Sequence, residues 1–185
     1  MQEIRFHGRG GQGTVMAAIL LSKAFFQDDF WVQSFPAFGV ERRGAPVEAY
    51  LRIDTQKIMA RYAITQPDHV LVQDDRLLQT VTVTQGLKPG GWVLLNTPSG
   101  ADYVQLLAGF RLATVDATRI ARDNGLGTRT HPIVNTAMIG AVARILGIPP
   151  IGAITAAIQA DIHTRTNANV RAAQEGYDRV KLVVA

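Results

Sequence analysis

The sequence contains no cysteine, and this absence removes several classes of chemistry. Without thiols the chain has no disulfide, no cysteine nucleophile, no thiolate zinc site and no cysteine-held iron–sulfur cluster. Any iron that takes part in a redox reaction served by this protein must therefore be bound by another chain.

Long apolar runs are also missing. The longest covers residues 15–21, far short of the roughly 20 apolar residues that a membrane-spanning helix needs. Residues 1–8, MQEIRFHG, lack the basic and then apolar order of a signal peptide. We therefore expect a cytoplasmic protein that does not contact a membrane.

Charged residues are few and scattered. They make up 18% of the 185 residues, and 19 Lys and Arg against 15 Asp and Glu give a net charge of +4. A nucleic-acid-binding protein would show a denser basic stripe, so no nucleic-acid partner is expected. A mild positive charge instead suits an anionic ligand or an acidic partner chain. The length and the 47% hydrophobic content predict a single globular domain over residues 1–185.

No group of residues has the spacing of a catalytic or metal site. Ser34 has no nucleophile-elbow context, so acyl-enzyme catalysis is not predicted. Asp74 and Asp75 follow an apolar run and suit either an acid–base pair or a helix cap, of which capping is the simpler reading. Metal-ligand spacing is absent among the four histidines, which are His7, His69, His131 and His163.

Periodicity predicts an α/β protein. Strands are expected over residues 4–8, 32–38, 47–53, 70–72, 92–96 and 112–115. Helices are expected over residues 12–26, 117–122, 134–146, 151–160 and 167–180. Residues 32–38 and 47–53 are expected to pair as a hairpin. The alternation predicts a three-layer α/β/α fold with a mostly parallel Rossmann-like sheet, helices on both faces and a helical C-terminal third.

A glycine-rich loop lies between the first expected strand and the first expected helix. It consists of Gly8, Arg9, Gly10, Gly11, Gln12 and Gly13. Three interpretations remain open: close packing of helix on strand, a backbone cradle for an anionic ligand shared with another subunit, or NAD or FAD binding by a stand-alone protein. The last requires an acid about 20 residues further on to hold the ribose, and residues 35–38, FPAF, offer none.

A second loop carries three adjacent charges, Glu41, Arg42 and Arg43, between Gly39 and Gly44. The charges suit either a solvated turn or a contact with a carboxylate or phosphate, because the planar guanidinium group binds both in two contacts.

Both loops belong to sequence blocks that resemble a known family. Residues 5–13, RFHGRGGQG, residues 34–47, SFPAFGVERRGAPV, and residues 134–141, VNTAMIGA, resemble the gamma domain of the pyruvate and 2-oxoacid:ferredoxin oxidoreductases. The tail around Asn167 and Gly176 is similar as well. The second block departs from the common pattern after Phe35, and it has Val40 where a proline is usual.

The resemblance implies a gamma subunit that is not catalytic by itself. Such a complex oxidatively decarboxylates a 2-oxo acid to an acyl-CoA, with thiamine diphosphate, magnesium and [4Fe–4S] clusters held by alpha, beta and delta-type subunits. Ferredoxin or another acceptor takes the electrons. The two loops, residues 8–13 and 41–43, are then expected to contact coenzyme A or a neighbouring subunit. The resemblance does not identify the 2-oxo acid or the terminal acceptor.

Overall fold

The computed structural model describes residues 1–37 and 44–183, which form one mixed sheet of seven strands. The order across the sheet is β2-β3-β1-β4-β5-β6-β7. In chain order the strands are β1 (Gln2–Arg9), β2 (Trp31–Pro36), β3 (Pro46–Asp54), β4 (His69–Val72), β5 (Trp92–Asn96), β6 (Arg111–Val115) and β7 (Lys181–Val183). β1, β4, β5 and β6 are parallel, whereas β3 and β7 run antiparallel to their neighbours.

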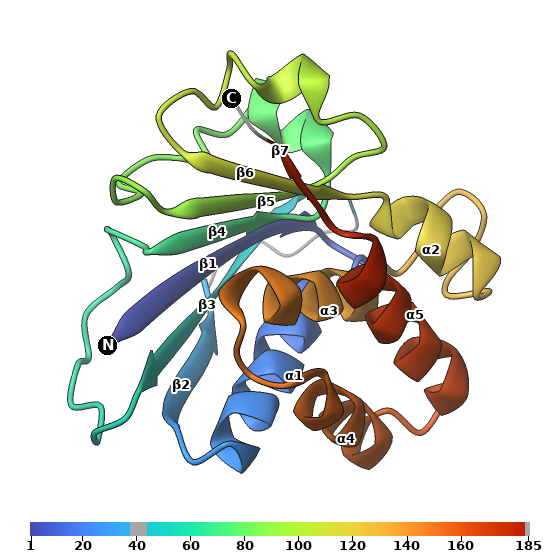
Figure 1. The fold of residues 1–185 in the computed structure, drawn as a ribbon, viewed down its shortest axis with the longest axis horizontal. Coiled ribbons are helices and arrows are strands. Elements are labelled where there is room, and N and C mark those ends of the chain that lie inside the picture. The colour runs from blue at the N-terminus through green and yellow to red at the C-terminus, as the bar shows by residue number, and fades with distance from the viewer. Residues whose placement is uncertain (38–43, 184–185) are drawn as a thin grey trace.

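The α-helices are gathered on one face of this sheet (Figure 1). They are α1 (Thr14–Gln27), α2 (Ala117–Asp123), α3 (Asn135–Leu146), α4 (Ile151–Asp161) and α5 (Thr166–Arg179). Alternate side chains of the strands, such as Ile4, Phe6 and Leu94, are completely buried beneath them. The α/β class, the mostly parallel sheet and the helical C-terminal third agree with expectation.

The second face has a thinner covering than the predicted layer of helices. Val70, Val72 and Val93 are buried there beneath the 3-10 helices η1 (Asp75–Gln79) and η2 (Ala101–Tyr103) and their loops. The third layer is therefore built from 3-10 turns and loops and contains no α-helix in the described residues. The segment TVTVT at residues 80–84 explains part of this difference, because β-branched residues lower helix propensity.

Helices α3 and α5 cross at very close range through two glycines. A Cβ at Gly140 would overlap the carbonyl of Ala173, and a Cβ at Gly176 would overlap the carbonyl of Ala137. Thr136 Oγ1 also donates to Asn169 Oδ1 at 3.2 Å between the same helices. The block at residues 134–141 is thus a helix-packing element.

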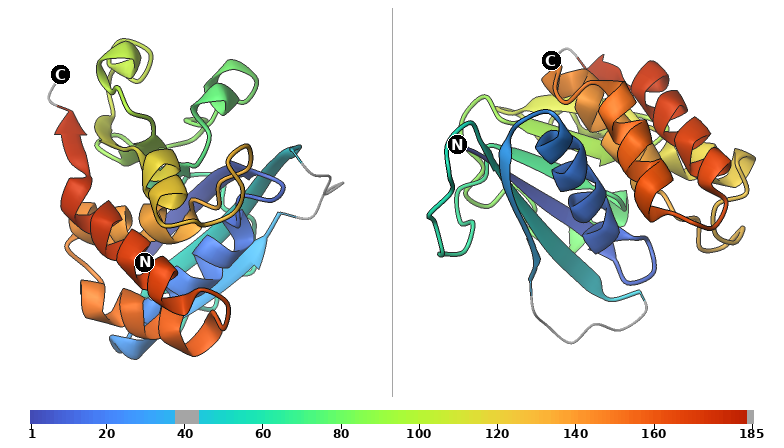
Figure 2. Two further views of the ribbon diagram at one scale, coloured as in Figure 1. Left: turned by 90° about the vertical axis from the view of Figure 1, so that its right-hand side faces the viewer. Right: turned by 90° about the horizontal axis from the view of Figure 1, so that it is seen from below.

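Strands β2 and β3 form the predicted hairpin at one edge of the sheet, seen from two sides in Figure 2. On the second face of this part of the sheet, Arg52 is 1% exposed and its Nε donates to Glu3 Oε1 at 2.8 Å. The guanidinium group lies over the rings of Phe35 and Tyr62, 5.4 and 4.7 Å from their centroids. This buried ion pair joins β3 to β1.

Of the two edge strands of the sheet, β2 was predicted from the sequence and β7 was not. Strand β2 ends at Pro36, so the predicted strand is wrong at Ala37, which follows it without strand structure. The last predicted strand residue, Phe38, lies outside the described residues, as do Glu41, Arg42 and Arg43. Strand β7 is not predicted by the pattern, because three residues after a helix carry too little periodicity to indicate a strand. Within residues 1–37 and 44–183, no helix combines the length and apolar character that a membrane crossing requires.

Candidate functional site

The carboxyl ends of the parallel strands open onto a crevice beside the glycine-rich loop. In open α/β sheets, ligands bind outside these ends, where the connections from adjacent strands leave in opposite directions. Here α1 leads from β1 towards β2, whereas η1 follows β4 towards β5. A cavity of about 470 Å³ lies in this region, lined by Gln12, Gln73, Asp74, Asp75, Arg76, Asn96, Pro98, Asp116, Thr118, Arg119, Arg122, Asp123, Thr130 and Pro132.

The glycines of the loop have different functions. Gly13 has a φ of 78°, which a residue with a side chain rarely adopts, and a Cβ there would overlap the Asn135 amide at the start of α3. A Cβ at Gly8 would overlap Thr14 Oγ1 and Gln73 Oε1. These two glycines allow close packing, as the first interpretation requires. For Gly11, no atom of residues 1–37 or 44–183 lies within 4 Å of the would-be Cβ.

Arg9 holds the glycine-rich loop against the segment that follows β4. Its Nε donates to Asp74 Oδ2 at 2.8 Å, and its backbone N–H donates to Gln12 Oε1 at 2.8 Å. Gly10 N–H donates to Ala45 O at 2.9 Å, which holds the loop against the backbone just after the charged segment at residues 41–43. The same Asp74 accepts from Arg76 N–H at 3.0 Å, so the predicted cap is confirmed.

A buried amide borders the crevice at the end of β4. Gln73 is completely buried, and its Oε1 accepts from Thr14 Oγ1 at 2.6 Å. Its Nε2 has no hydrogen-bond partner within the described part of the chain. A buried donor without a partner costs about 1–3 kcal/mol, so a polar ligand atom at this position would be stabilising. Asn96 supports Gln73 by donating from Nδ2 to its carbonyl at 2.8 Å.

The first turn of α1 adds backbone N–H donors to the same region. The helix begins at Thr14 after Gly13, and no side chain in the described part of the molecule caps it. The first amides of a helix lack intrahelical partners and carry a partial positive charge, so they attract anions. The geometry thus suits a ligand with phosphate or carbonyl oxygens.

His7 supports β1 from the second face. It is 3% exposed, its Nε2 accepts from Arg5 Nε at 3.0 Å, and its Nδ1 lies 3.3 Å from Glu48 Oε1. Burial lowers the pKa of His7 to about 4, despite the opposing effect of Glu48. Tyr50 donates to the same carboxylate at 2.7 Å. The ring is therefore a neutral packing histidine beneath the loop.

The sheet order argues against dinucleotide binding. A Rossmann site uses the carboxyl end of a parallel neighbour of β1 to hold the ribose. On the side towards which α1 leads, that neighbour is β3, which is antiparallel and presents its amino end, with Arg9 paired to Pro46. The acid that would bind the ribose is therefore absent because no parallel strand ends at the place where that acid would be needed.

The structure brings residues 8–13 together with several polar residues that the sequence did not identify as site residues. Gln73 directly follows β4, and Asn96 is the last residue of β5. Thr118 lies in the first turn of α2, and Asn135 begins α3. A polar residue directly after a buried strand is the signal that identifies such positions. Asp116 caps α2, accepting from Arg119 N–H at 2.9 Å.

Comparisons with known proteins agree with the resemblance seen in the sequence blocks. Residues 3–179 match the family described as pyruvate ferredoxin/flavodoxin oxidoreductase. The chain is 49% identical to pyruvate synthase subunit PorC of Methanocaldococcus jannaschii over 181 residues, 97% of either chain. It is 45% identical to the pyruvate/ketoisovalerate oxidoreductases common subunit gamma of Pyrococcus abyssi, with 98% of each covered. The crystal structure of pyruvate oxidoreductase subunit PORC from Thermotoga maritima superposes with a TM-score of 0.84 at 36% identity, covering 99% of this chain and 98% of that one.

Proposed function

The chain belongs to the pyruvate ferredoxin/flavodoxin oxidoreductase family, and we propose that it is the gamma subunit of a 2-oxoacid:acceptor oxidoreductase complex. One observation carries this proposal: the similarity to gamma and PorC subunits runs from end to end at nearly equal length. The complex oxidatively decarboxylates a 2-oxo acid and transfers the acyl group to coenzyme A.

In this proposal the chain is a structural subunit, and its partners hold the redox and thiamine cofactors. It has no cysteine for an iron–sulfur cluster. Within residues 1–37 and 44–183, no group of three His, Asp or Glu side chains is placed to bind a metal ion. We assign thiamine diphosphate, magnesium and [4Fe–4S] clusters to alpha, beta and delta-type subunits, with ferredoxin or another protein as electron acceptor and the cytoplasm as location.

We assign the loop at residues 8–13 a contact with coenzyme A. The amide and phosphate oxygens of coenzyme A can accept hydrogen bonds from Gln73 Nε2, which has no partner within the described residues. They can also accept from the backbone N–H groups at the start of α1. The charged residues Glu41, Arg42 and Arg43 are proposed to contact coenzyme A or a partner subunit. They directly precede Gly44 and Ala45, whose backbones are hydrogen-bonded to Gly10.

Co-expression tests the subunit assignment. The chain should co-purify with its thiamine- and cluster-binding partners, and the complex should reduce a viologen dye with pyruvate or 2-oxoisovalerate in the presence of coenzyme A. The chain alone should give no turnover. Unaided turnover by the purified chain, or a complex with full activity without it, would refute the proposal.

A double variant tests the charged loop. Arg42→Ala with Arg43→Ala should raise the KM for coenzyme A or weaken assembly by about tenfold, because each arginine contributes a charged contact. Lys57→Ala with Arg61→Ala removes the same charge from an exposed loop away from the crevice and should change neither quantity. If the loop variant keeps wild-type KM and assembly, the role of residues 41–43 is wrong while the subunit assignment stands.

A further inference from the structure

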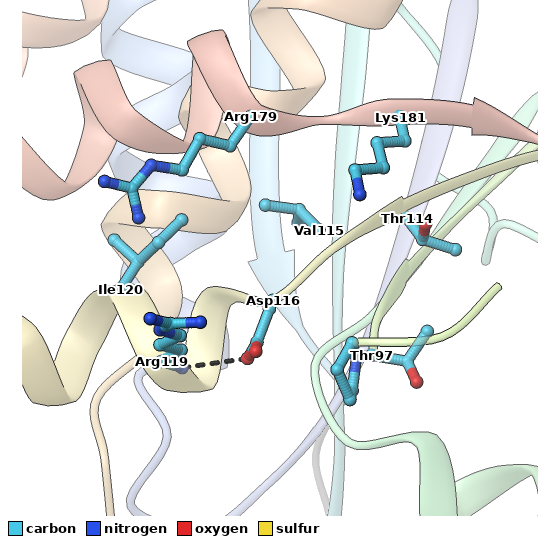
Figure 3. A pocket seen from close by; sticks show the side chains of 9 residues that line it. Thr97, Thr114, Val115, Asp116, Arg119, Ile120, Arg179 and Lys181 are labelled. Atoms are coloured by element: carbon cyan, nitrogen blue, oxygen red, sulfur yellow. Dashed lines mark hydrogen bonds between the residues drawn. The ribbon is translucent and has the colours of Figure 1, made fainter.

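A second cavity, of about 270 Å³, adjoins the crevice on the side of β7 (Figure 3). The two cavities share Pro98, Asp116 and Arg119. The second one lies beyond the carboxyl end of β6, on the far side of the crevice from the glycine-rich loop. It is lined by Thr97, Pro98, Thr114, Val115, Asp116, Arg119, Ile120, Arg179 and Lys181.

Three cationic side chains from three different elements line this cavity. Arg119 comes from α2, Arg179 from the last turn of α5, and Lys181 from β7. The antiparallel pairing of β7 with β6 places Lys181 directly opposite Thr114. Residues far apart in the chain are therefore brought to one cavity by the strand that the sequence did not predict.

The cavity has an excess of positive charge. Asp116 is its one carboxylate among the lining residues, and that group already accepts from Arg119 N–H as the cap of α2. Arg119 forms an exposed ion pair with Asp123 at 3.7 Å, which is weak and exchanges readily, so its guanidinium group is available to a bound anion. Arg179 Nη2 lies 2.9 Å from Glu175 Oε2, and Glu175 is 27% exposed. The other N–H donors of the Arg179 guanidinium group remain for an anion while this pair is kept. Lys181 forms no ion pair within the described residues.

The floor of the cavity adds hydroxyl groups. Thr97 and Thr114 are each 5% exposed and line it at the ends of β5 and β6. The Thr97 hydroxyl already donates to Ser99 O at 3.3 Å, so Thr114 is the hydroxyl that can donate to a ligand. Three cations around a hydroxyl donor are suited to a tetrahedral oxyanion, which accepts hydrogen bonds in several directions. The volume is sufficient for a phosphate or diphosphate group, and a folded peptide segment is too large for it.

We propose that this cavity binds a phosphate group of a small-molecule ligand, with Arg179 and Lys181 as the principal charged contacts. The site does not depend on the proposed contact between the glycine-rich loop and coenzyme A. A coenzyme A phosphate and the phosphate of a separate metabolite share this chemistry, and competition distinguishes the two sources.

Calorimetric titration of the full chain with inorganic pyrophosphate tests the site. The double variant Arg179→Gln with Lys181→Gln should raise the Kd at least tenfold, and Lys181→Arg should retain binding. Lys57→Gln with Arg61→Gln provides the matched control, because it removes the same charge from an exposed loop on the opposite side of β1. The control should stay within twofold of wild type. Thermal melts of all variants establish that each is folded.

Competition by coenzyme A against pyrophosphate would assign the site to coenzyme A, and lack of competition would assign it to another phosphorylated ligand. The proposal is overturned if wild-type protein does not bind pyrophosphate, or if both double variants lose binding equally. It is also overturned if the cavity variant binds pyrophosphate normally but no longer assembles, since the cations would then contact an acidic partner surface.

Discussion

Arg9 and Asp74 form an ion pair of 2.8 Å that joins the end of β1, within the glycine-rich loop motif, to the residues after β4. The pair lies beside the opening of the crevice, and its side chains are 27% and 16% exposed. Arg9 also donates from Nη1 to Gly44 O at 3.1 Å, and Asp74 accepts from Arg76 N–H at 3.0 Å. The pair therefore fixes the position of one loop relative to the other.

Breaking this pair should loosen the loop more than it destabilises the fold. Arg9→Gln and Asp74→Asn are expected to show a coupling of about 1 kcal/mol in a double-mutant cycle of unfolding free energies. Asn is itself a good cap, so Asp74→Asn keeps the hydrogen bond to Arg76 N–H. Urea denaturation of the four proteins measures the cycle. A coupling indistinguishable from zero would show that the pair does not hold the loop.

The crossing of α3 and α5 should not tolerate a methyl group. Gly176→Ala is expected to destabilise the chain by about 2–3 kcal/mol, because the new Cβ overlaps the Ala137 carbonyl and the helices must separate. Gly152→Ala is the matched control, since that glycine is in α4 with nothing within 4 Å of its would-be Cβ. The control should be neutral or up to about 1 kcal/mol more stable. Equal effects of both substitutions on thermal unfolding would contradict the packing argument.

The buried pair of Arg52 and Glu3 should be costly to break. Removing one partner leaves a buried charge unpaired, so Glu3→Gln or Arg52→Met is expected to cost about 3–5 kcal/mol. The exposed pair between Lys88 and Asp68 gives the comparison, with Lys88 44% exposed. Lys88→Gln should cost at most about 1 kcal/mol. Chemical denaturation measures both, and a cost for Glu3→Gln as small as that for Lys88→Gln would refute the prediction.

The lowered pKa of the buried His7 predicts that the protein loses stability in mild acid. Its folded pKa, about 4 because of burial, is below the ordinary value of 6.5. Between these pH values the unfolded chain binds more protons, so the free energy of unfolding falls as the pH drops from 6.5 to 4. The loss attributable to His7 is on the order of 3 kcal/mol.

His7→Gln should flatten that part of the stability curve, because Gln can donate to Glu48 and accept from Arg5 without titrating. Thermal melts at intervals of pH compare the two proteins. A variant that loses stability between pH 6.5 and 4 as steeply as wild type would place the titrating group elsewhere.

The sequence predicted the elements well where pattern and turn signals coincide. The strands at residues 70–72 and 92–96 are short apolar runs, and Asp74 and Asp116 cap the helical segments η1 and α2, as their positions indicate. The second face was less predictable. It is covered by 3-10 turns in which burial depends on tertiary contacts, for example at Leu77 and Leu107.

The site was predictable only in part for a related reason. The glycine-rich loop has a local motif, whereas Gln73 and Asn135 reach it through strand order and helix crossing. Lys181 reaches the second cavity through a three-residue strand paired with β6. Such relationships depend on register between distant segments, which a single sequence does not contain.

The two glycines between α3 and α5 have an effect beyond the helices themselves. They set how near α3 lies to α5, and α3 starts at Asn135, which rests on Gly13. Helix α5 thereby fixes, through α3, the position of the glycine-rich loop at residues 8–13. Shortening the protein from its C-terminal end should therefore harm the N-terminal site, although the deleted residues never touch it.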